Sequence, residues 1–327
     1  MPDAPIPTMT REAHRAVLLD AATEGGELHQ AGDDHLVLRR PGTGAGGGTL
    51  IVTFDTLDAM RVRPGGLPLS TGVAQRKGWA TLDVLADGRT WFRDDAVHRL
   101  FDGLTDDGIF DDYDDVIFAG GGMGAYGAAA HSVAAPGSVL FLMQPYATLD
   151  RDVAPWERRF RSAWSLPFGP RYGNAARMAE AAARVYVVTD PMRPADAMHA
   201  SLFQGPHVTR LPAPHAGGDI QARLEGAGIL DRLLIAARGG RLTPARFAQL
   251  WRARRDDPAW LAGLLRHVDR LDRPWLQAIV AGHITRRTGS AVARRRMNAA
   301  LARLAAEDRT APGGLTPEPV PARLAGE

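Results

Sequence analysis

Five of the eight residues at positions 120–127 are glycine, in the order GGGMGAYG, and they directly follow the apolar stretch VIFA. Small residues continue the pattern, because the next four residues read AAAH. A strand can turn abruptly into a helix where side chains are absent, since glycine accepts backbone angles and close approaches that other residues resist. The sequence therefore predicts a strand, a tight turn and a small-residue helix over residues 116–134.

Three kinds of glycine-rich turn have this layout, and their other requirements separate them. A Walker-type phosphate loop needs Gly-Lys-Ser/Thr, which does not follow here. A dinucleotide-binding turn opens its domain and is followed by a strand that ends in an acid, whereas the next predicted strand here ends in Gln144 and Pro145. The third kind is the nucleophile elbow, G-x-S-x-G. Gly120, Gly122 and Gly124 occupy its first, third and fifth positions, so glycine stands where the elbow has serine.

Apolar stretches that alternate with helical stretches predict the fold class. Continuous apolar strands separated by helices indicate an α/β protein with a mostly parallel sheet covered on both faces. A Gly-rich turn between the first two strands predicts that they form an antiparallel hairpin. After residue 220 the sequence is helical only, with Thr243-Pro244 and Asp257-Pro258 as helix starts. The predicted strands are residues 35–41, 49–57, 79–87, 115–120, 138–145, 184–190 and 207–214.

The stretch GGGMGAYGAAA resembles the elbow of a bacterial branch of α/β-hydrolase-like proteins, G-x-S-M-G-G-Y-G-A, with Gly122 in place of serine. The resemblance covers roughly residues 36–233 and includes LIVTF, VVTDPMRPADAMHASLF and PHAGGDIQARLEGAGILDRLL. Similar sequences that share TWFRD and DAMHA are often labelled phosphoadenosine phosphosulfate reductase. That label implies a catalytic cysteine, and this chain contains no cysteine.

The resemblance implies an α/β-hydrolase-like sheet and a nucleophile–acid–histidine triad. Asp190, at a predicted strand end, fits the acid. The family's histidine falls at Gly218, and His215, three residues earlier, is a candidate base. Asp55 is a candidate carboxylate nucleophile or base, although LIVTFD is equally well explained as a core strand and its exit turn.

The same resemblance implies an anion hole at the elbow. Its candidate members are the Phe54 loop, the space at Gly122 and the backbone N–H groups of Met123 and Gly124. Three further residues are candidate ligand contacts: Asp196, His199 and Arg171. Asp196 and His199 are three positions apart on a predicted helix, which also suits a simple hydrogen-bonded pair. The histidine spacing matches no metal signature, so we expect neither a metal nor a cofactor.

The predicted domains follow these patterns. Residues 1–30 form an N-terminal helical segment, and residues 31–232 form the α/β-hydrolase-like domain, with a cap-like insertion at 151–175. Residues 233–309 form an Arg-rich helical subdomain. The Pro/Gly-rich residues 310–327 form a tail that we expect to be disordered.

Charge and hydropathy limit the partners. No apolar run is long enough to cross a bilayer and no export signal precedes the domain, so we expect a cytoplasmic protein without membrane contact. Residues 234–309 contain 16 Arg against 6 acidic residues. A solvated helical surface explains that asymmetry better than a nucleic-acid site does, and opposite charges in two parts of the chain also favour their docking on each other or a homo-oligomer.

Two functions of different class remain. In the first, a degenerate fold without its serine binds a small anionic or acylated ligand, or a protein partner, at the former active-site cleft. In the second, a hydrolase or transferase uses a non-serine nucleophile or an activated water. Loss of the elbow hydroxyl favours the first, because fold alone does not establish activity.

Overall fold

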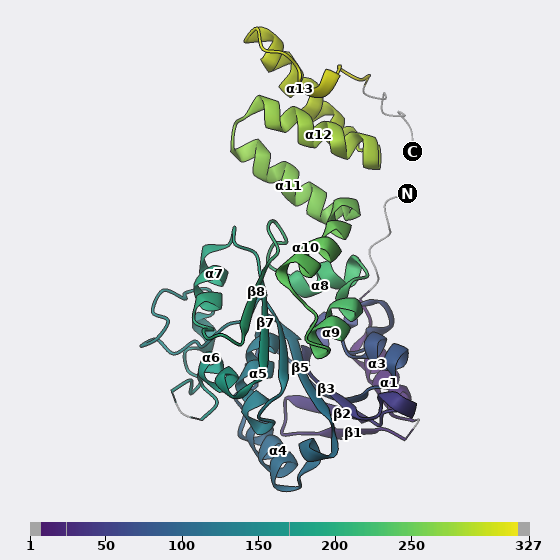
Figure 1. Ribbon diagram of the computed structural model, residues 1–327, viewed down its shortest axis with the longest axis vertical. Coiled ribbons are helices and arrows are strands. Elements are labelled where there is room, and N and C mark those ends of the chain that lie inside the picture. The colour runs from purple at the N-terminus through teal and green to yellow at the C-terminus, as the bar shows by residue number, and fades with distance from the viewer. Residues whose placement is uncertain (1–7, 24, 170, 320–327) are drawn as a thin grey trace. The chain divides into compact units, whose positions relative to one another are not determined.

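Eight strands form one sheet in the order β1-β2-β4-β3-β5-β6-β7-β8 (Figure 1) in a computed structural model that describes residues 8–23, 25–169 and 171–319. β2 runs antiparallel to β1 and β4, and every other neighbouring pair is parallel. This is an α/β-hydrolase-like sheet, and it confirms the predicted fold class. The strands are β1(Glu27–Gln30), β2(His35–Arg40), β3(Thr49–Thr56), β4(Ala80–Ala86), β5(Asp115–Gly121), β6(Val139–Met143), β7(Arg184–Thr189) and β8(Val208–Pro212).

The predicted hairpin of β2 with β3 is wrong. β4 lies between these two strands, and β2 instead pairs with β1. The glycine-rich connection packs against the residues before β4, where a Cβ on Gly46 would lie 1.8 Å from the carbonyl oxygen of Lys77. All seven residues of β4 are buried. Such a strand is stable when neighbours flank it on both sides.

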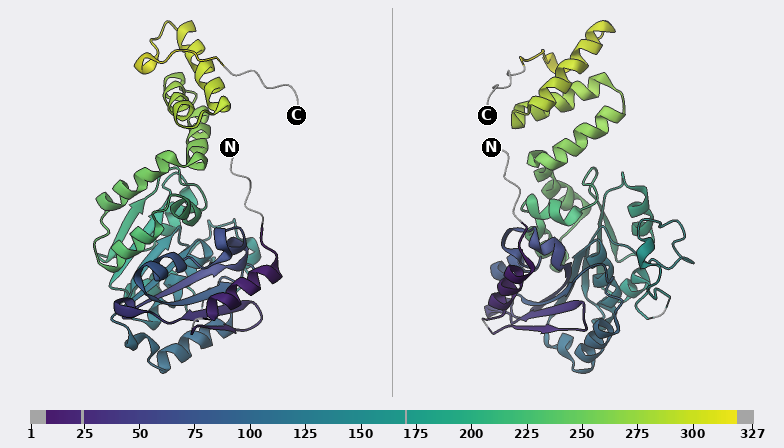
Figure 2. Two further views of the ribbon diagram at one scale, coloured as in Figure 1. Left: turned by 90° about the vertical axis from the view of Figure 1, so that its right-hand side faces the viewer. Right: turned by 180° about the vertical axis from the view of Figure 1, so that it is seen from behind.

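Helices cover both faces of the sheet (Figure 2). Val84 of β4 contributes to the larger apolar cluster, together with Phe101 of α4 and Ala128 of α5. Its neighbour Leu85 contributes to a separate cluster with Leu18 of α1. The alternation follows from the strand period of two. Helices of this part of the chain are α1(Arg11–Ala22), α2(Leu57–Arg61), α3(Thr71–Lys77), α4(Asp95–Asp106), α5(Met123–His131), α6(Ala175–Met178), α7(Pro194–Ser201), α8(Ile220–Gly226), α9(Leu230–Arg238) and α10(Pro244–Leu250).

Tertiary contacts divide the chain into two units, and the sheet belongs to the larger one. The larger unit contains the described residues up to Pro214 together with Gly218–Leu250. The smaller unit contains His215–Gly217 and the described residues from Trp251 onward, with helices α11(Pro258–Arg270), α12(Pro274–Thr288) and α13(Ala291–Ala306). The predicted boundary at residue 233 stays a prediction.

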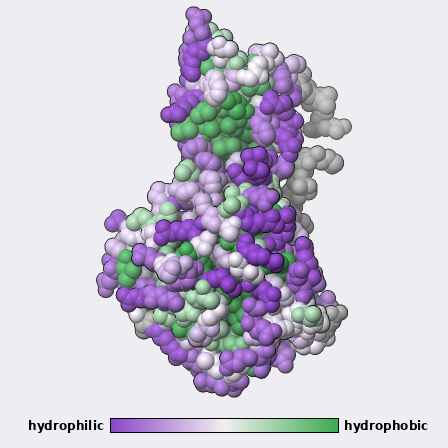
Figure 3. All heavy atoms as spheres, in the orientation of Figure 1, coloured by the Kyte–Doolittle hydropathy of each residue, from purple (hydrophilic) through white to green (hydrophobic). Residues whose placement is uncertain are grey.

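The smaller unit begins its helices as the sequence indicates. Asp257 caps α11, since its Oδ1 accepts the N–H of Ala259 at 2.8 Å. Gly289, at φ +66°, ends α12. Figure 3 shows apolar residues gathered on one face of this unit. No helix among the described residues is long and apolar enough to span a membrane.

Glycines set the distance between β5 and α5. A Cβ on Gly120 would lie 2.4 Å from the carbonyl carbon of Gly124, and a Cβ on Gly124 would lie 2.1 Å from the carbonyl oxygen of Phe54. A Cβ on Gly127 would meet the Phe54 ring at 2.6 Å. Backbone atoms cannot move aside without displacing the sheet, so positions 120 and 124 require glycine, and at position 127 a larger residue would displace the Phe54 ring.

We predict that Gly124→Ala lowers the free energy of unfolding by several kcal/mol, because its Cβ overlaps a backbone carbonyl in a close-packed interior. Gly103→Ala is the matched control. Gly103 lies in α4 with open space beside it, so the same substitution should stabilise by about 0.5–1 kcal/mol. Urea unfolding of both variants tests this. Equal stability of Gly124→Ala and wild type would contradict the close crossing.

The same core contains an uncharged histidine. His131 is completely buried at the end of α5, and its Nδ1 donates to the carbonyl oxygen of Gly127 at 3.0 Å. Its ring packs against Phe54 and Phe101, with centroids 5.4 and 4.7 Å away. Burial lowers the pKa of His131 to about 3, despite the opposing hydrogen bond to Gly127.

This shift predicts an acid sensitivity. Between pH 6.5 and about 3 the unfolded chain binds a proton at His131 that the folded chain excludes, so stability falls as the pH falls. His131→Phe should remove about 2 kcal/mol of the stability difference between pH 7.5 and pH 5. Urea unfolding at both pH values measures it, and His29→Phe controls for replacing a histidine at an exposed position. An unchanged pH difference in His131→Phe would contradict a neutral, buried imidazole.

Candidate functional site

A cleft of about 890 Å³ opens beside the elbow in the larger unit. Its walls come from four places: the α2–α3 region, the elbow itself, Gln144 after the end of β6, and the α8–α9 region. None of the described residues at 151–175 lines it, so the predicted cap-like segment contributes no wall there. The lining is largely apolar and includes Val62, Leu67, Leu69, Met123, Ile220 and Leu230.

Gly122 has the conformation of an elbow residue and space for a side chain. It connects β5 to α5 at φ +56° and ψ −118°, and its N–H donates to the carbonyl oxygen of Met143 at 2.9 Å. A Cβ here would have only the Cε2 atom of Tyr146 nearby, at 3.9 Å. The positive φ disfavours other residues. A Cβ at position 122 would not overlap its surroundings, whereas a Cβ at the glycines around it would.

The first turn of α5 supplies hydrogen-bond donors at this point. The N–H groups of Met123 and Gly124 have no acceptor among the described residues, as is normal for the start of a helix. Both residues line the cleft. The helix dipole adds partial positive charge there. A carbonyl or anionic oxygen would therefore be stabilised beside Gly122.

Phe54 contributes packing to this region. Its ring lies in the core against Phe92, with centroids 5.0 Å apart, and its carbonyl oxygen faces Gly124. Its proposed part in an anion hole stays a prediction. Two other residues near the elbow have left-handed backbones, Trp91 at φ +55° and Gln144 at φ +53°. The Trp91 N–H donates to Met123 Sδ at 3.2 Å, and non-glycine residues with such angles gather at functional sites.

Asp55 lines the cleft, but both of its carboxylate oxygens are engaged. Arg63 Nη1 lies 2.6 Å from Asp55 Oδ2 and Nη2 lies 3.2 Å from Oδ1, while the N–H of Thr56 donates to Oδ1 at 2.9 Å. Arg63 Nε also pairs with Glu225 at 3.0 Å. Burial alone would lower the pKa of Arg63, but Asp55 and Glu225 outweigh burial and raise it. An ion pair of this kind holds the Asp55 side chain in one position.

Asp190 lies at the carboxyl end of a strand, and Gly218 lies beside the cleft. Asp190 directly follows β7, is 2% exposed, and accepts the N–H of Met192 at 2.9 Å. Gly218 lines the cleft and carries no side chain. His215 belongs to the smaller unit, at φ +61°, with its ring 4.5 Å from that of His267. The roles of Asp190 and His215 stay predictions.

Asp196 and His199 share α7 but do not bond to each other in the described structure. His199 Nε2 donates to Glu157 Oε2 at 3.1 Å, because its Nδ1 accepts the N–H of Ala147 at 3.3 Å. Asp196 pairs with Arg159 at 2.5 Å. Both are fully buried, and neither lines the cleft. A direct ligand contact by either residue is therefore not supported by this geometry.

Glu157 completes this buried network, and the sequence analysis missed it. Arg159 Nη2 lies 2.5 Å from Glu157 Oε2. Burial would raise the pKa of Glu157, but hydrogen bonds from His199 and Arg159 outweigh it and lower the pKa to about 2. Burial also lowers the pKa of His199. The pair is thus a neutral imidazole that donates to a carboxylate.

Arg171 lies elsewhere. It pairs with Asp102 and lines a shallow surface groove with Tyr172 and Met178.

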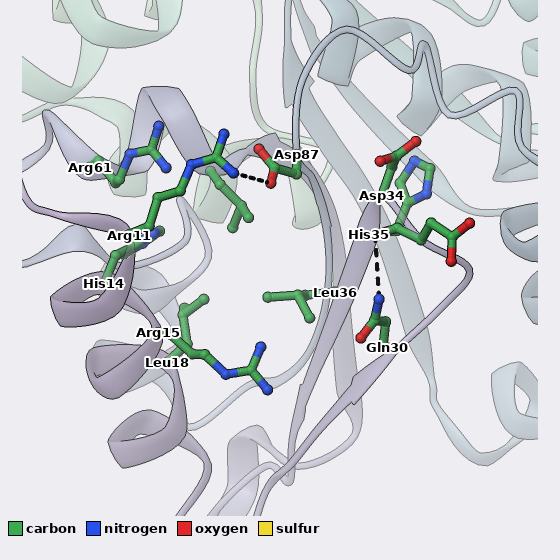
Figure 4. A pocket seen from close by; sticks show the side chains of 12 residues that line it. Arg11, His14, Arg15, Leu18, Gln30, Asp34, His35, Leu36, Arg61 and Asp87 are labelled. Atoms are coloured by element: carbon green, nitrogen blue, oxygen red, sulfur yellow. Dashed lines mark hydrogen bonds and ion pairs between the residues drawn. The ribbon is translucent and has the colours of Figure 1, made fainter.

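Figure 4 shows another hollow, of about 190 Å³, between α1 and β2, where Arg11 reaches Asp87 at 3.1 Å. None of the predicted site residues lines that hollow. The described residues contain no group of three side chains arranged to hold a metal.

The chain is similar in fold to solved esterases and acyltransferases. An esterase of Pyrococcus furiosus is 15% identical (65% of this chain, 92% of that chain, TM-score 0.41). The esterase of Pyrobaculum calidifontis is 14% identical (73% and 93%, TM-score 0.40), and the capsule O-acetyltransferase of Neisseria meningitidis serogroup A is 12% identical (64% and 95%, TM-score 0.41). The sequence matches no protein-family model and no curated protein. The fold assignment therefore rests on the strand order.

The ion pair of Asp55 predicts a stability effect. Arg63→Met should lower the free energy of unfolding by about 3–5 kcal/mol, because it leaves two carboxylates of the cleft without their cation. Arg76→Met is the matched control, since Arg76 pairs with Asp231 from a half-exposed position and should contribute at most about 1 kcal/mol. Urea unfolding compares them. An equal, small effect would mean that Asp55 is not held by Arg63.

Proposed function

We propose that this chain is a serine-less α/β-hydrolase-like protein that binds a small acyl-bearing ligand in the cleft beside Gly122. One observation carries the proposal. Gly122 keeps the elbow conformation next to open space and unpaired N–H donors, whereas the glycines around it are required for packing. A site of this shape can receive a carbonyl oxygen. A cleft of this size and largely apolar lining suits a small molecule.

Binding is better supported than catalysis. The position of the elbow nucleophile, 122, has no side chain, and neither has position 218, where the resemblance puts the histidine. Among the candidate residues, Asp55 is the carboxylate that lines the cleft, and Arg63 and the Thr56 N–H occupy both of its oxygens. A nucleophile needs a free oxygen that faces the substrate.

The charge of the cleft favours an acylated ligand over an anionic one. Four carboxylates line it against two guanidiniums, which leaves an excess of negative charge. Burial raises the pKa of Glu225, one of the four, although Arg63 and Gln221 oppose it. An anionic ligand would add repulsion to that site. A neutral carbonyl group would not.

The test is fluorophosphonate labelling and ester turnover of wild type and Gly122→Ser. Wild type should do neither, because position 122 offers no hydroxyl. Gly122→Ser should be labelled slowly, since the space and the N–H donors are present but position 218 supplies no histidine base. The substitution should cost about 1–3 kcal/mol in stability for the positive φ. Mass spectrometry locates the label.

Gly122→Ala is the matched control, because it adds the same Cβ and the same backbone strain without a hydroxyl. Ester turnover by wild type would overturn the proposal and direct attention to Asp55 and His215. Absence of label on a folded Gly122→Ser variant would contradict a preserved anion hole.

A further inference from the structure

We propose that Gln144 selects the ligand of the cleft, and that its side-chain oxygen accepts a hydrogen bond from an N–H group, so that the preferred ligand class is a carboxamide. This inference rests on the proposed function, since it names the chemistry of the same cleft. No sequence motif marks Gln144 as a ligand contact. The position of Gln144, the fixed orientation of its amide and the charge around it support this role.

Gln144 lies directly beside the elbow. β5 and β6 are parallel neighbours in which Gly121 is opposite Met143, and Gly122 and Gln144 directly follow these last paired residues. The Gly122 N–H donates to the carbonyl oxygen of Met143, the residue before Gln144, at 2.9 Å. Adjacent strands are about 4.8 Å apart. Gln144 lines the cleft together with Gly122 and Met123. A single functional group of a ligand can therefore contact both sides.

Asp196 fixes which end of the amide faces the cleft. Gln144 Nε2 donates to Asp196 Oδ2 at 3.0 Å and to Tyr146 Oη at 3.3 Å. A carboxylate only accepts hydrogen bonds, so the nitrogen of the amide must be the atom that faces it. Both N–H bonds are then used within the protein. The remaining group, Oε1, has no donor among the described residues.

The network behind Gln144 keeps this orientation. Asp196 is 1% exposed and pairs with Arg159 at 2.5 Å and with Arg193 at 2.7 Å. Rotation of the Gln144 amide would bring its oxygen against that carboxylate, which is repulsive, and would remove the hydrogen bond from Nε2 to Asp196 Oδ2. Asp196 is therefore a positioning residue, and Gln144 is the residue that touches the ligand.

A carboxamide matches both sides of the site. Its carbonyl oxygen can accept from the N–H groups of Met123 and Gly124, and its N–H can donate to Gln144 Oε1. An ester offers the same carbonyl but no donor. A carboxylate would set a charged oxygen against Gln144 Oε1, in a cleft that already has an excess of carboxylates.

The experiment compares hexanamide, methyl hexanoate and hexanoate, which share one acyl chain. The protein is labelled with ¹³C at the methionine methyl groups, and the Met123 signal, assigned with Met123→Leu, reports binding in the cleft. Met297, in the smaller unit, is the reference signal. We expect hexanamide to bind about fivefold more tightly than methyl hexanoate, as one hydrogen bond allows, and hexanoate to bind least.

Two variants test the role of Gln144 itself. Gln144→Met keeps the length of the side chain and removes its polar atoms, so the amide and the ester should then bind equally. Asp196→Asn allows the Gln144 amide to turn its N–H₂ toward the cleft, so the ester should equal or exceed the amide. The wild-type series alone decides the question if either variant does not fold.

The outcomes separate the two proposals. If the ester binds as tightly as the amide, or hexanoate binds most tightly, the role of Gln144 is overturned and ligand binding in the cleft remains. If no probe shifts the Met123 signal, the proposed function fails for acyl ligands and the inference fails with it. If the preference for the amide persists in Gln144→Met, another group accepts its hydrogen bond and the assignment to Gln144 is wrong.

Discussion

The close crossing of α5 over the end of β5 is the constraint on which the rest of the larger unit depends. Helix and strand meet at backbone distance, because Gly120 and Gly124 leave no side chain between them and the carbonyl oxygen of Phe54 fills the remaining space. This crossing directs the first turn of α5 to the carboxyl edge of the sheet. It also buries α5 from Gly124 to its last residue. The conformation of the turn at Gly122 is thus a product of this packing.

The sequence predicts those parts of the fold whose signal lies in the hydrophobic pattern of neighbouring residues. Seven strands lie close to their predicted positions, and β3 to β7, the interior strands that have a parallel neighbour, are largely apolar runs. β1 was missed because ELHQ is short, polar and mostly exposed, and only its pairing with β2 makes it a strand. The hairpin failed for a related reason. Nothing near residues 41–48 indicates that β4, some thirty residues later, would separate β2 from β3.

The candidate site divides in the same way. The elbow could be found from sequence, because backbone angles and missing side chains leave a glycine pattern. The network behind it could not, because Gln144 and Asp196 are 52 positions apart and Arg159 and Asp196 are 37 apart. Each of these residues is ordinary when read alone. Their meaning comes from strand register and from burial, which place one amide between a carboxylate and the cleft.

The conformation of Gly122 also bears on how such a chain could change. A serine at φ +56° is under strain that the fold must hold, and a glycine at the same angles is relaxed. Replacing serine by glycine at this position therefore raises the stability and removes the hydroxyl in one step. Substitutions elsewhere that cost a similar amount of stability could then accumulate. A later return to serine would restore that strain in a fold that has lost the stability needed to tolerate it. The change from serine to glycine is therefore easier than its reversal.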